Sequence, residues 1–190
     1  MAIIKPAGTW TYEDLISLPD DGRRYEIIEG ELYEMPAPSW DHAVTIMNLI
    51  LLLAPVVQAL GGRVLTAPLD VFFEGADPVQ PDIVVLLPVS TAIGAGRGVE
   101  GAPDLLIEVL SPSSRGHDVL TKRALYARAG VREYWIVDPV SREVEVLTLD
   151  RDAFHTVQRA SGDDAVISSL LAEAALPLAT IFAGVDQIED

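Results

Sequence analysis

The chain has 190 residues, of which 49% are hydrophobic, and a formal net charge of −16. This length corresponds to about one domain, and the apolar content excludes a disordered chain. The negative charge argues against a nucleic-acid partner, because phosphate binding depends largely on basic side chains. The sequence contains no cysteine, which excludes disulfides, thiolate metal sites and cysteine nucleophiles. We therefore expect a single domain over residues 1–190, located in the cytoplasm.

The apolar segments of the chain predict a core rather than a membrane anchor. Residues 1–10 hold one lysine and no long apolar run, so no signal peptide is expected. The longest apolar run covers residues 49–57. It is much shorter than the roughly 20 residues that cross a bilayer, so no membrane partner is expected.

The first half of the chain predicts helices and strands in alternation. A short helix is expected over residues 10–18, and a β-hairpin over residues 23–36 with its turn at Glu29 and Gly30. A long helix from about 41 to 60 follows. Residues 63–73 are predicted to form one strand.

The chain then continues as a second strand, a loop and a strand–helix–strand unit. A strand is expected at 82–88, and the glycine-rich residues 90–101 are predicted to form a mobile loop. A strand at 104–110 and a helix at 117–129 follow. Two further strands are expected at 133–138 and 142–149, before a tail with a short strand and an apolar segment. This order predicts an α/β fold around a mixed sheet.

Two carboxylates occupy unusual positions in the predicted strands. Asp82 begins one apolar strand, and Glu108 interrupts another. A buried carboxylate is normally paired, hydrogen-bonded or bound to metal, because burying it alone costs several kcal/mol. Two carboxylates on adjacent strands would repel each other, and a divalent cation with oxygen ligands, such as Mg²⁺, would remove that repulsion. The alternative is that Asp82 lies near water and Glu108 pairs with an arginine.

Lys122 is the second unusual charge. The chain has 11 arginines but only two lysines, Lys5 and Lys122. Lysine carries a compact charge whose pKa is shifted by burial, whereas arginine stays protonated. Lys122 could therefore serve a site, or it could form a surface ion pair with Asp118, four residues earlier on the same helix. The surrounding basic segment, 115–132, could likewise face an anionic substrate or form a solvated helix face.

The three histidines show no spacing typical of a zinc site. His42, His117 and His155 match neither HExxH nor HxH. Each is expected to lie at the surface or at a helix cap.

Three segments together identify a family resemblance. They are residues 23–42 (RRYEIIEGELYEMPAPSWDH), residues 80–86 (QPDIVVL) and residues 101–139, which include the run PDLLIEVLSPSSRGHDVLTKRALY. These segments resemble the Uma-type family of putative restriction endonucleases, within the PD-(D/E)XK nuclease superfamily. The resemblance extends from about Tyr12 to Leu149. It implies a restriction-endonuclease-like core, in which helices flank a mixed β-sheet, with the N-terminal β-hairpin added to it.

The resemblance also implies a set of site residues. Asp82 matches the aspartate of the Pro-Asp motif, Glu108 the acid on the neighbouring strand, and Val109 a position whose carbonyl completes the metal shell. The motif's lysine position holds Leu110, so Lys122 is expected to supply the ammonium from the following helix. An acid of the N-terminal hairpin is expected to assist the metal, and of Glu26 and Glu29 we prefer Glu26.

The implied activity is Mg²⁺-dependent hydrolysis of DNA phosphodiester bonds, with Mn²⁺ as a possible substitute. Asp82, Glu108, Lys122 and Glu26 would be catalytic, and Asp82, Glu108 and Val109 would bind the metal. Arg115 and Arg123 would hold the flanking backbone, and the enzyme would act as a homodimer. Two alternatives stay open: a catalytically silent binding or regulatory protein, favoured by Leu110 and the net charge, and a hydrolase of a small phosphoester.

Overall fold

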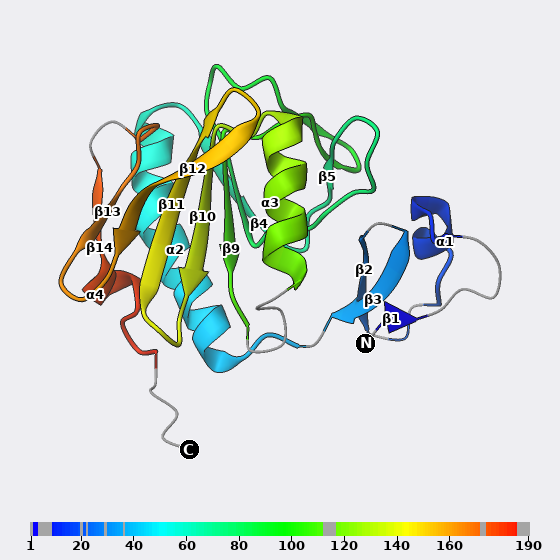
Figure 1. Ribbon diagram of the computed structural model, residues 1–190, viewed down its shortest axis with the longest axis horizontal. Coiled ribbons are helices and arrows are strands. Elements are labelled where there is room, and N and C mark those ends of the chain that lie inside the picture. The colour runs from blue at the N-terminus through cyan, green and yellow to red at the C-terminus, as the bar shows by residue number, and fades with distance from the viewer. Residues whose placement is uncertain are drawn as a thin grey trace.

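The computed structural model describes residues 2–3, 9–19, 21, 23–28, 30–35, 37–111, 117–171 and 174–185. Its centre is a six-stranded mixed sheet with the strand order β12-β11-β10-β9-β6-β4 (Figure 1). These strands are β4 (Arg63–Thr66), β6 (Ile83–Leu86), β9 (Leu105–Val109), β10 (Glu133–Asp138), β11 (Glu143–Asp150) and β12 (Ala153–Ala160). β9 and β10 are parallel, and all the other neighbours in this sheet are antiparallel. The expected α/β fold with a mixed sheet is confirmed.

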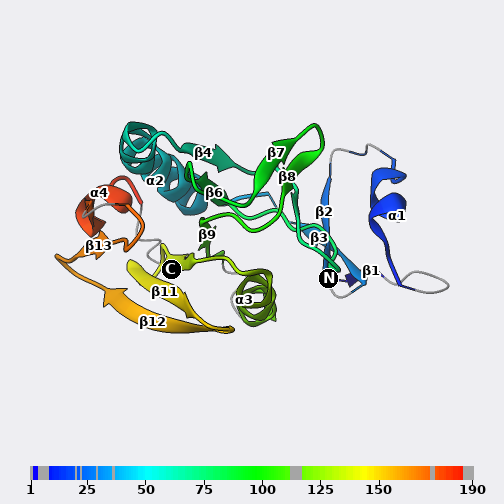
Figure 2. The same ribbon diagram turned by 90° about the horizontal axis from the view of Figure 1, so that it is seen from above.

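Helices cover both faces of this sheet. α2 (Trp40–Ala59) and α4 (Leu178–Ile181) lie on one face and α3 (His117–Ala129) on the other (Figure 2). The Ser39 hydroxyl caps α2 by accepting from the His42 amide at 3.3 Å. This cap satisfies one of the donors left open in the first helical turn. β13 (Ala165–Ile167) and β14 (Ala175–Pro177) form a small ribbon near α4.

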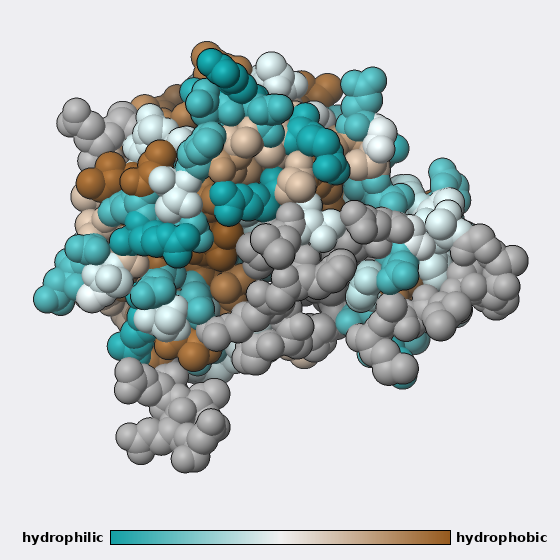
Figure 3. Space-filling view, in the orientation of Figure 1, coloured by the Kyte–Doolittle hydropathy of each residue, from teal (hydrophilic) through white to brown (hydrophobic). Residues whose placement is uncertain are grey.

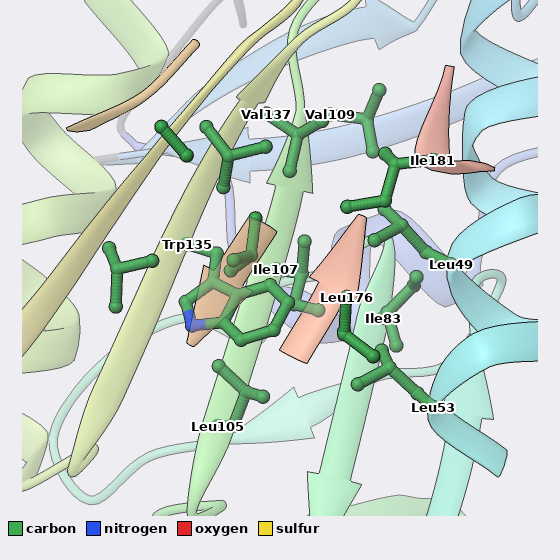
Figure 4. Packing of buried hydrophobic residues seen from close by; sticks show 14 of the residues in the cluster. Leu49, Leu53, Ile83, Leu105, Ile107, Val109, Trp135, Val137, Leu176 and Ile181 are labelled. Carbon is green, nitrogen blue, oxygen red and sulfur yellow. The ribbon is translucent and has the colours of Figure 1, made fainter. Parts of the chain in front are cut away.

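The side chains of β9 alternate between the two faces of the sheet. Ile107 belongs to the apolar cluster with Leu49 and Leu53 of α2, and Figure 4 shows these two leucines pointing toward the sheet. Leu106 belongs instead to the cluster that includes Tyr126 of α3. Because successive strand residues point to opposite faces, Glu108 lies on the α3 side with Leu106.

An N-terminal sheet lies beside the core, on the side of α3 (Figures 1 and 2). It consists of β1 (Ala2–Ile3), β2 (Arg24–Ile28) and β3 (Glu31–Met35), with α1 (Tyr12–Ile16) next to it. β2 and β3 pair antiparallel, and Gly30 between them has a φ of +78°. That left-handed conformation favours glycine, as a tight turn requires. Tyr12 connects this part to the core by donating to Asp70 at 3.1 Å.

Two predicted elements are wrong. Residues 63–73 are not one strand, because β4 ends at Thr66 and β5 (Val71–Phe72) belongs to a different sheet. Pro68 lies between them, and proline has no amide to donate to a strand ladder. The predicted mobile loop at 90–101 contains two strands, β7 (Ile93–Ala95) and β8 (Gly98–Glu100), and β8 pairs with β5. Gly98 permits this contact, since a Cβ there would lie 2.2 Å from the Asp70 carbonyl.

α2 is long and apolar enough, by length and composition alone, to span a membrane. Its buried side chains nevertheless recur every fourth residue, at Thr45, Leu49, Leu53 and Val57, and three of these four belong to the core cluster. This spacing is that of a helix with one face packed on a sheet. The hydrophilic residues in Figure 3 cover much of the opposite side of the molecule, which carries β12 and α3.

Candidate active site

The register of β6 and β9 brings the two predicted carboxylates together. The strands pair antiparallel with Ile83 opposite Ile107 and Val84 opposite Leu106. Continuing this register by one residue places Asp82 opposite Glu108. The Asp82 carbonyl accepts from the Ala67 amide at 3.2 Å, on the side of β4. Asp82 and Glu108 therefore form a pair without backbone hydrogen bonds between them, the arrangement in which facing side chains lie closest.

Asp82 is held in place by two contacts through the same oxygen. Its Oδ2 accepts from the Val109 amide at 2.8 Å and lies 3.3 Å from Nε2 of His42. The amide and carbonyl of a strand residue face the same neighbour. The Val109 carbonyl therefore also faces the Asp82 side, as the metal role predicted for it requires.

Glu108 is bound to two residues of α3. Its Oε1 lies 3.3 Å from the Lys122 ammonium and accepts from the Tyr126 hydroxyl at 2.7 Å. All three residues are buried, with 8% of Glu108, 3% of Lys122 and none of Tyr126 exposed. Lys122 and Tyr126 are one helical turn apart, so they present their polar groups to the same carboxylate. The Lys122 ammonium therefore approaches Glu108 from α3, the helix from which it was expected.

Asp82 and Glu108 offer the kind of donor atoms that a divalent cation binds, but the described side chains do not form a preformed cage. Asp82, Glu108 and the Val109 carbonyl would supply the oxygen ligands that Mg²⁺ prefers. In the part of the chain that the structure describes, no three histidine, aspartate or glutamate side chains cluster closely enough to hold an ion. Each carboxylate has its own cationic or hydrogen-bonding partner instead. The repulsion expected without metal is thereby offset.

A cleft opens beside Lys122. It has a volume of about 490 Å³, which is within the usual range for ligand pockets. One wall is α3, with Thr121, Leu125 and the exposed Arg128, and the opposite wall includes Ile27 of β2. A bound molecule would therefore contact the lysine that pairs with Glu108.

The sequence matches the family model for Uma2, described as putative restriction endonuclease, over residues 12–179. This is most of the chain. The chain belongs to the Uma2 family. No curated protein matches the sequence.

A solved structure supports the Uma2 fold. It is the crystal structure of a putative nuclease belonging to DUF820 from Anabaena variabilis ATCC 29413, with a TM-score of 0.70 and 24% sequence identity. The match covers 93% of this Uma2 chain and 99% of the other. At that identity the likeness shows the fold alone, and the predicted restriction-endonuclease-like core is confirmed by it together with the family match.

Other residues predicted for the Uma2 site lie elsewhere or outside the described residues. Glu29 and Arg115 are outside them, as is the side chain of Glu26, whose backbone belongs to β2. Arg123 donates to the carbonyl of Phe154 in β12 at 2.8 Å. Part of its guanidinium therefore binds the protein itself, and its contact with a substrate backbone stays a prediction.

Two buried carboxylates were not singled out from the sequence, and both have structural partners. Asp104 is 2% exposed, accepts from the Leu87 amide at 2.8 Å and pairs with Arg132 at 3.0 Å. Glu133 is fully buried and accepts from Trp135 and from Ser169. Asp104 directly precedes β9 and Glu133 begins β10, so both lie at the end of these strands opposite to Glu108. The Pro-Asp pair at residues 103–104 is therefore not a second site.

His42 and Tyr126 are the contacts that sequence reasoning missed. His42 was expected at the surface or at a helix cap, yet its side chain is only 13% exposed and faces Asp82. Tyr126 was not singled out, although it lies four residues after Lys122. That spacing is the one signal in the sequence that could have placed it beside the same carboxylate.

Asp77, on the rim of the cleft, provides a prediction about pH. Burial raises the pKa of this carboxyl, while the amide of Gly30 acts in the opposite direction. A carboxyl with a raised pKa in the folded state binds protons more tightly there, so stability falls as pH rises through that pKa. Asp77→Asn should therefore raise the melting temperature at pH 7 and leave it nearly unchanged at a pH below the ordinary pKa of aspartate. A lower melting temperature at pH 7 would show that the carboxylate itself stabilises the fold.

Proposed function

We propose that this Uma2-family chain is an endonuclease that hydrolyses phosphodiester bonds of DNA with Mg²⁺, for which Mn²⁺ can substitute. The observation that carries the proposal is the pairing of Asp82 and Glu108 across adjacent strands, with the Lys122 ammonium 3.3 Å from Glu108. Two facing carboxylates can hold a divalent cation for the hydrolysis of a phosphoester, and a buried lysine can stabilise the negative charge that develops.

In this mechanism each residue has a distinct task. Asp82, Glu108 and the Val109 carbonyl would hold the cation, which when bound polarises the phosphate and lowers the pKa of a bound water. Lys122 would orient the attacking water or stabilise negative charge on the phosphoryl oxygens. Tyr126 keeps Glu108 directed toward Lys122 through its hydrogen bond of 2.7 Å.

A small phosphoester is the second candidate substrate. The net charge of −16 disfavours long polyanions, and the cleft beside Lys122 has the size of a small-molecule site. The catalytically silent alternative rested on the net charge and on Leu110 in place of the motif lysine. The position of Lys122 beside Glu108 favours the enzyme over that alternative, because an ammonium is present at the site.

Cleavage assays separate the three candidates. The protein would be incubated with supercoiled plasmid, single-stranded DNA and bis(p-nitrophenyl) phosphate, each with Mg²⁺, with Mn²⁺ and with EDTA. We expect cleavage of DNA that EDTA abolishes. Turnover of bis(p-nitrophenyl) phosphate without any DNA cleavage would favour the small-substrate enzyme, and no turnover of any substrate would favour the binding or regulatory protein.

The homodimer expected from the sequence is part of the same proposal. Cutting both strands of a duplex usually takes two active sites. One chain supplies one pair of facing carboxylates, Asp82 and Glu108, where β6 begins and β9 ends. Sedimentation of the purified protein tests this point independently of activity.

A further inference from the structure

The face of α2 that points away from the sheet is apolar along most of its length. Its exposed and half-exposed positions follow one another at alternating spacings of four and three residues, and we call this row the outer seam. It consists of Trp40, Val44, Met47, Leu51, Ala54 and Gln58. Only the last of these residues is polar. The three largest side chains of the row are mostly in solvent, with 69% of Trp40, 55% of Met47 and 66% of Leu51 exposed.

The outer seam has no cover within the part of the chain that the structure describes. α4 lies along the flank of α2, where Asn48 donates to the carbonyls of Ile181 and Ala183 at 3.0 and 2.9 Å. Figures 1 and 2 show no labelled helix or strand on the outer side of α2. Met47 and Leu51 therefore stay at the surface. A continuous apolar patch of this kind on a folded domain usually marks an interaction site.

The spacing of the outer seam suits a second helix. Apolar residues that alternate at four and three residues are the pattern by which two helices pack along their length. α2 has 20 residues and is therefore about 30 Å long. That length matches the diameter of a standard protein interface, which buries about 800 Å² on each partner. Tryptophan and methionine, both present in the seam, are enriched at such interfaces.

The distribution of charge favours a second copy of this chain as the partner. Residues 43–59 contain no charged side chain, although the whole chain has a net charge of −16. Contact through acidic surfaces would bring like charges together, whereas two copies of α2 present uncharged faces to each other. A membrane suits this helix less well. α2 has no lysine or arginine to bind lipid headgroups, and anionic lipids repel an acidic protein.

We propose that the outer seam of α2 is the interface of a homodimer, in which α2 of one copy packs on α2 of the other. This inference rests on the proposed function for the need for two copies, and it adds the surface through which they meet. In such a symmetric contact both copies contribute the same residues. Each substitution in the seam therefore acts twice in every dimer.

Sedimentation equilibrium of the full chain tests the interface. Wild-type protein should be a dimer. Leu51→Glu should raise the dimer dissociation constant by at least about 100-fold, because two apolar contacts are lost and two charges are placed in the interface. Val157→Glu is the matched control. It makes the same change in charge at an apolar residue of β12 that is 58% exposed, and it should leave the dissociation constant unchanged.

The reactivity of a single cysteine locates the contact even if Leu51→Glu folds poorly. The chain contains no cysteine, so Leu51→Cys introduces one thiol in a smaller and uncharged side chain. Its rate constant for reaction with a maleimide should fall as the protein concentration rises and the dimer forms. The rate constant for Val157→Cys, the matched control, should not depend on protein concentration.

Three results would overturn the proposal. They are a wild-type chain that stays monomeric at its highest soluble concentration, a dimer that leaves Leu51→Cys fully reactive, and binding to phosphatidylcholine vesicles that Leu51→Glu abolishes. Cleavage of plasmid and of bis(p-nitrophenyl) phosphate would be measured on the same samples. An active monomer would refute the interface and leave the proposed hydrolysis, whereas an inactive dimer that meets both tests would do the reverse.

Discussion

Asp82→Asn is expected to abolish metal binding and to reduce phosphodiester cleavage by roughly 10³-fold. The substitution keeps the size of the side chain, and the amide oxygen can still accept from the Val109 amide, which now donates to Asp82 Oδ2 at 2.8 Å. It removes the negative charge that a cation would need. Metal ions contribute several kcal/mol to such transition states, and each 1.36 kcal/mol is a factor of ten in rate. Calorimetry with Mn²⁺ and initial cleavage rates measure the two effects.

Asp104→Asn is the matched control for this variant. Asp104 is also a buried aspartate that follows a proline, but it pairs with Arg132 at 3.0 Å and lies at the opposite end of β9. Its replacement should lower the free energy of unfolding and leave metal binding and cleavage per folded molecule unchanged. If Asp82→Asn bound Mn²⁺ as tightly as wild type, the metal site proposed at Asp82 and Glu108 would be wrong.

Glu108→Gln is expected to destabilise the metal-free protein by about 3 kcal/mol. The Lys122 ammonium is 3.3 Å from Glu108, and the two side chains are only 4% and 10% exposed. Removing one partner of a buried ion pair leaves an uncompensated charge, at a cost of about 3–5 kcal/mol. This expectation replaces the gain in stability that mutual repulsion of Asp82 and Glu108 would predict, because the lysine and the Tyr126 hydroxyl already offset the charge of Glu108.

A double-mutant cycle measures this coupling. Urea unfolding would be recorded for Glu108→Gln, Lys122→Met and the double variant. The double variant should be more stable than the sum of the two single losses predicts, because no charge is left buried without its partner. Asp163→Asn, at an exposed turn carboxylate, serves as the control for a simple change in net charge. Additive losses in the cycle would show that Lys122 and Glu108 do not interact in solution.

Helices and strands with a strong local pattern were predictable from the sequence. The helix expected at 117–129 is α3 over the same residues, and the strand expected at 133–138 is β10. Their apolar periodicity and the glycine after α3 are local signals that need no tertiary contact. The split at Pro68 and the strands within 90–101 were missed, since β5 and β8 are short: β5 pairs with β8 and with Val79, and β8 also pairs with β7. Such strands are defined by partners that are distant along the chain.

The sequence by itself determined the α/β class, the family and the two carboxylates at Asp82 and Glu108. It did so because a charged residue in or beside an apolar strand is conspicuous without any knowledge of its neighbours. Only the tertiary structure decided which groups face those carboxylates. The antiparallel register of β6 and β9 sets Asp82 opposite Glu108, α3 brings Lys122 and Tyr126 to one of them, and α2 brings His42 to the other. The physical reason is that a residue's partners across a sheet or between helices depend on register and packing, which no single segment of the sequence contains.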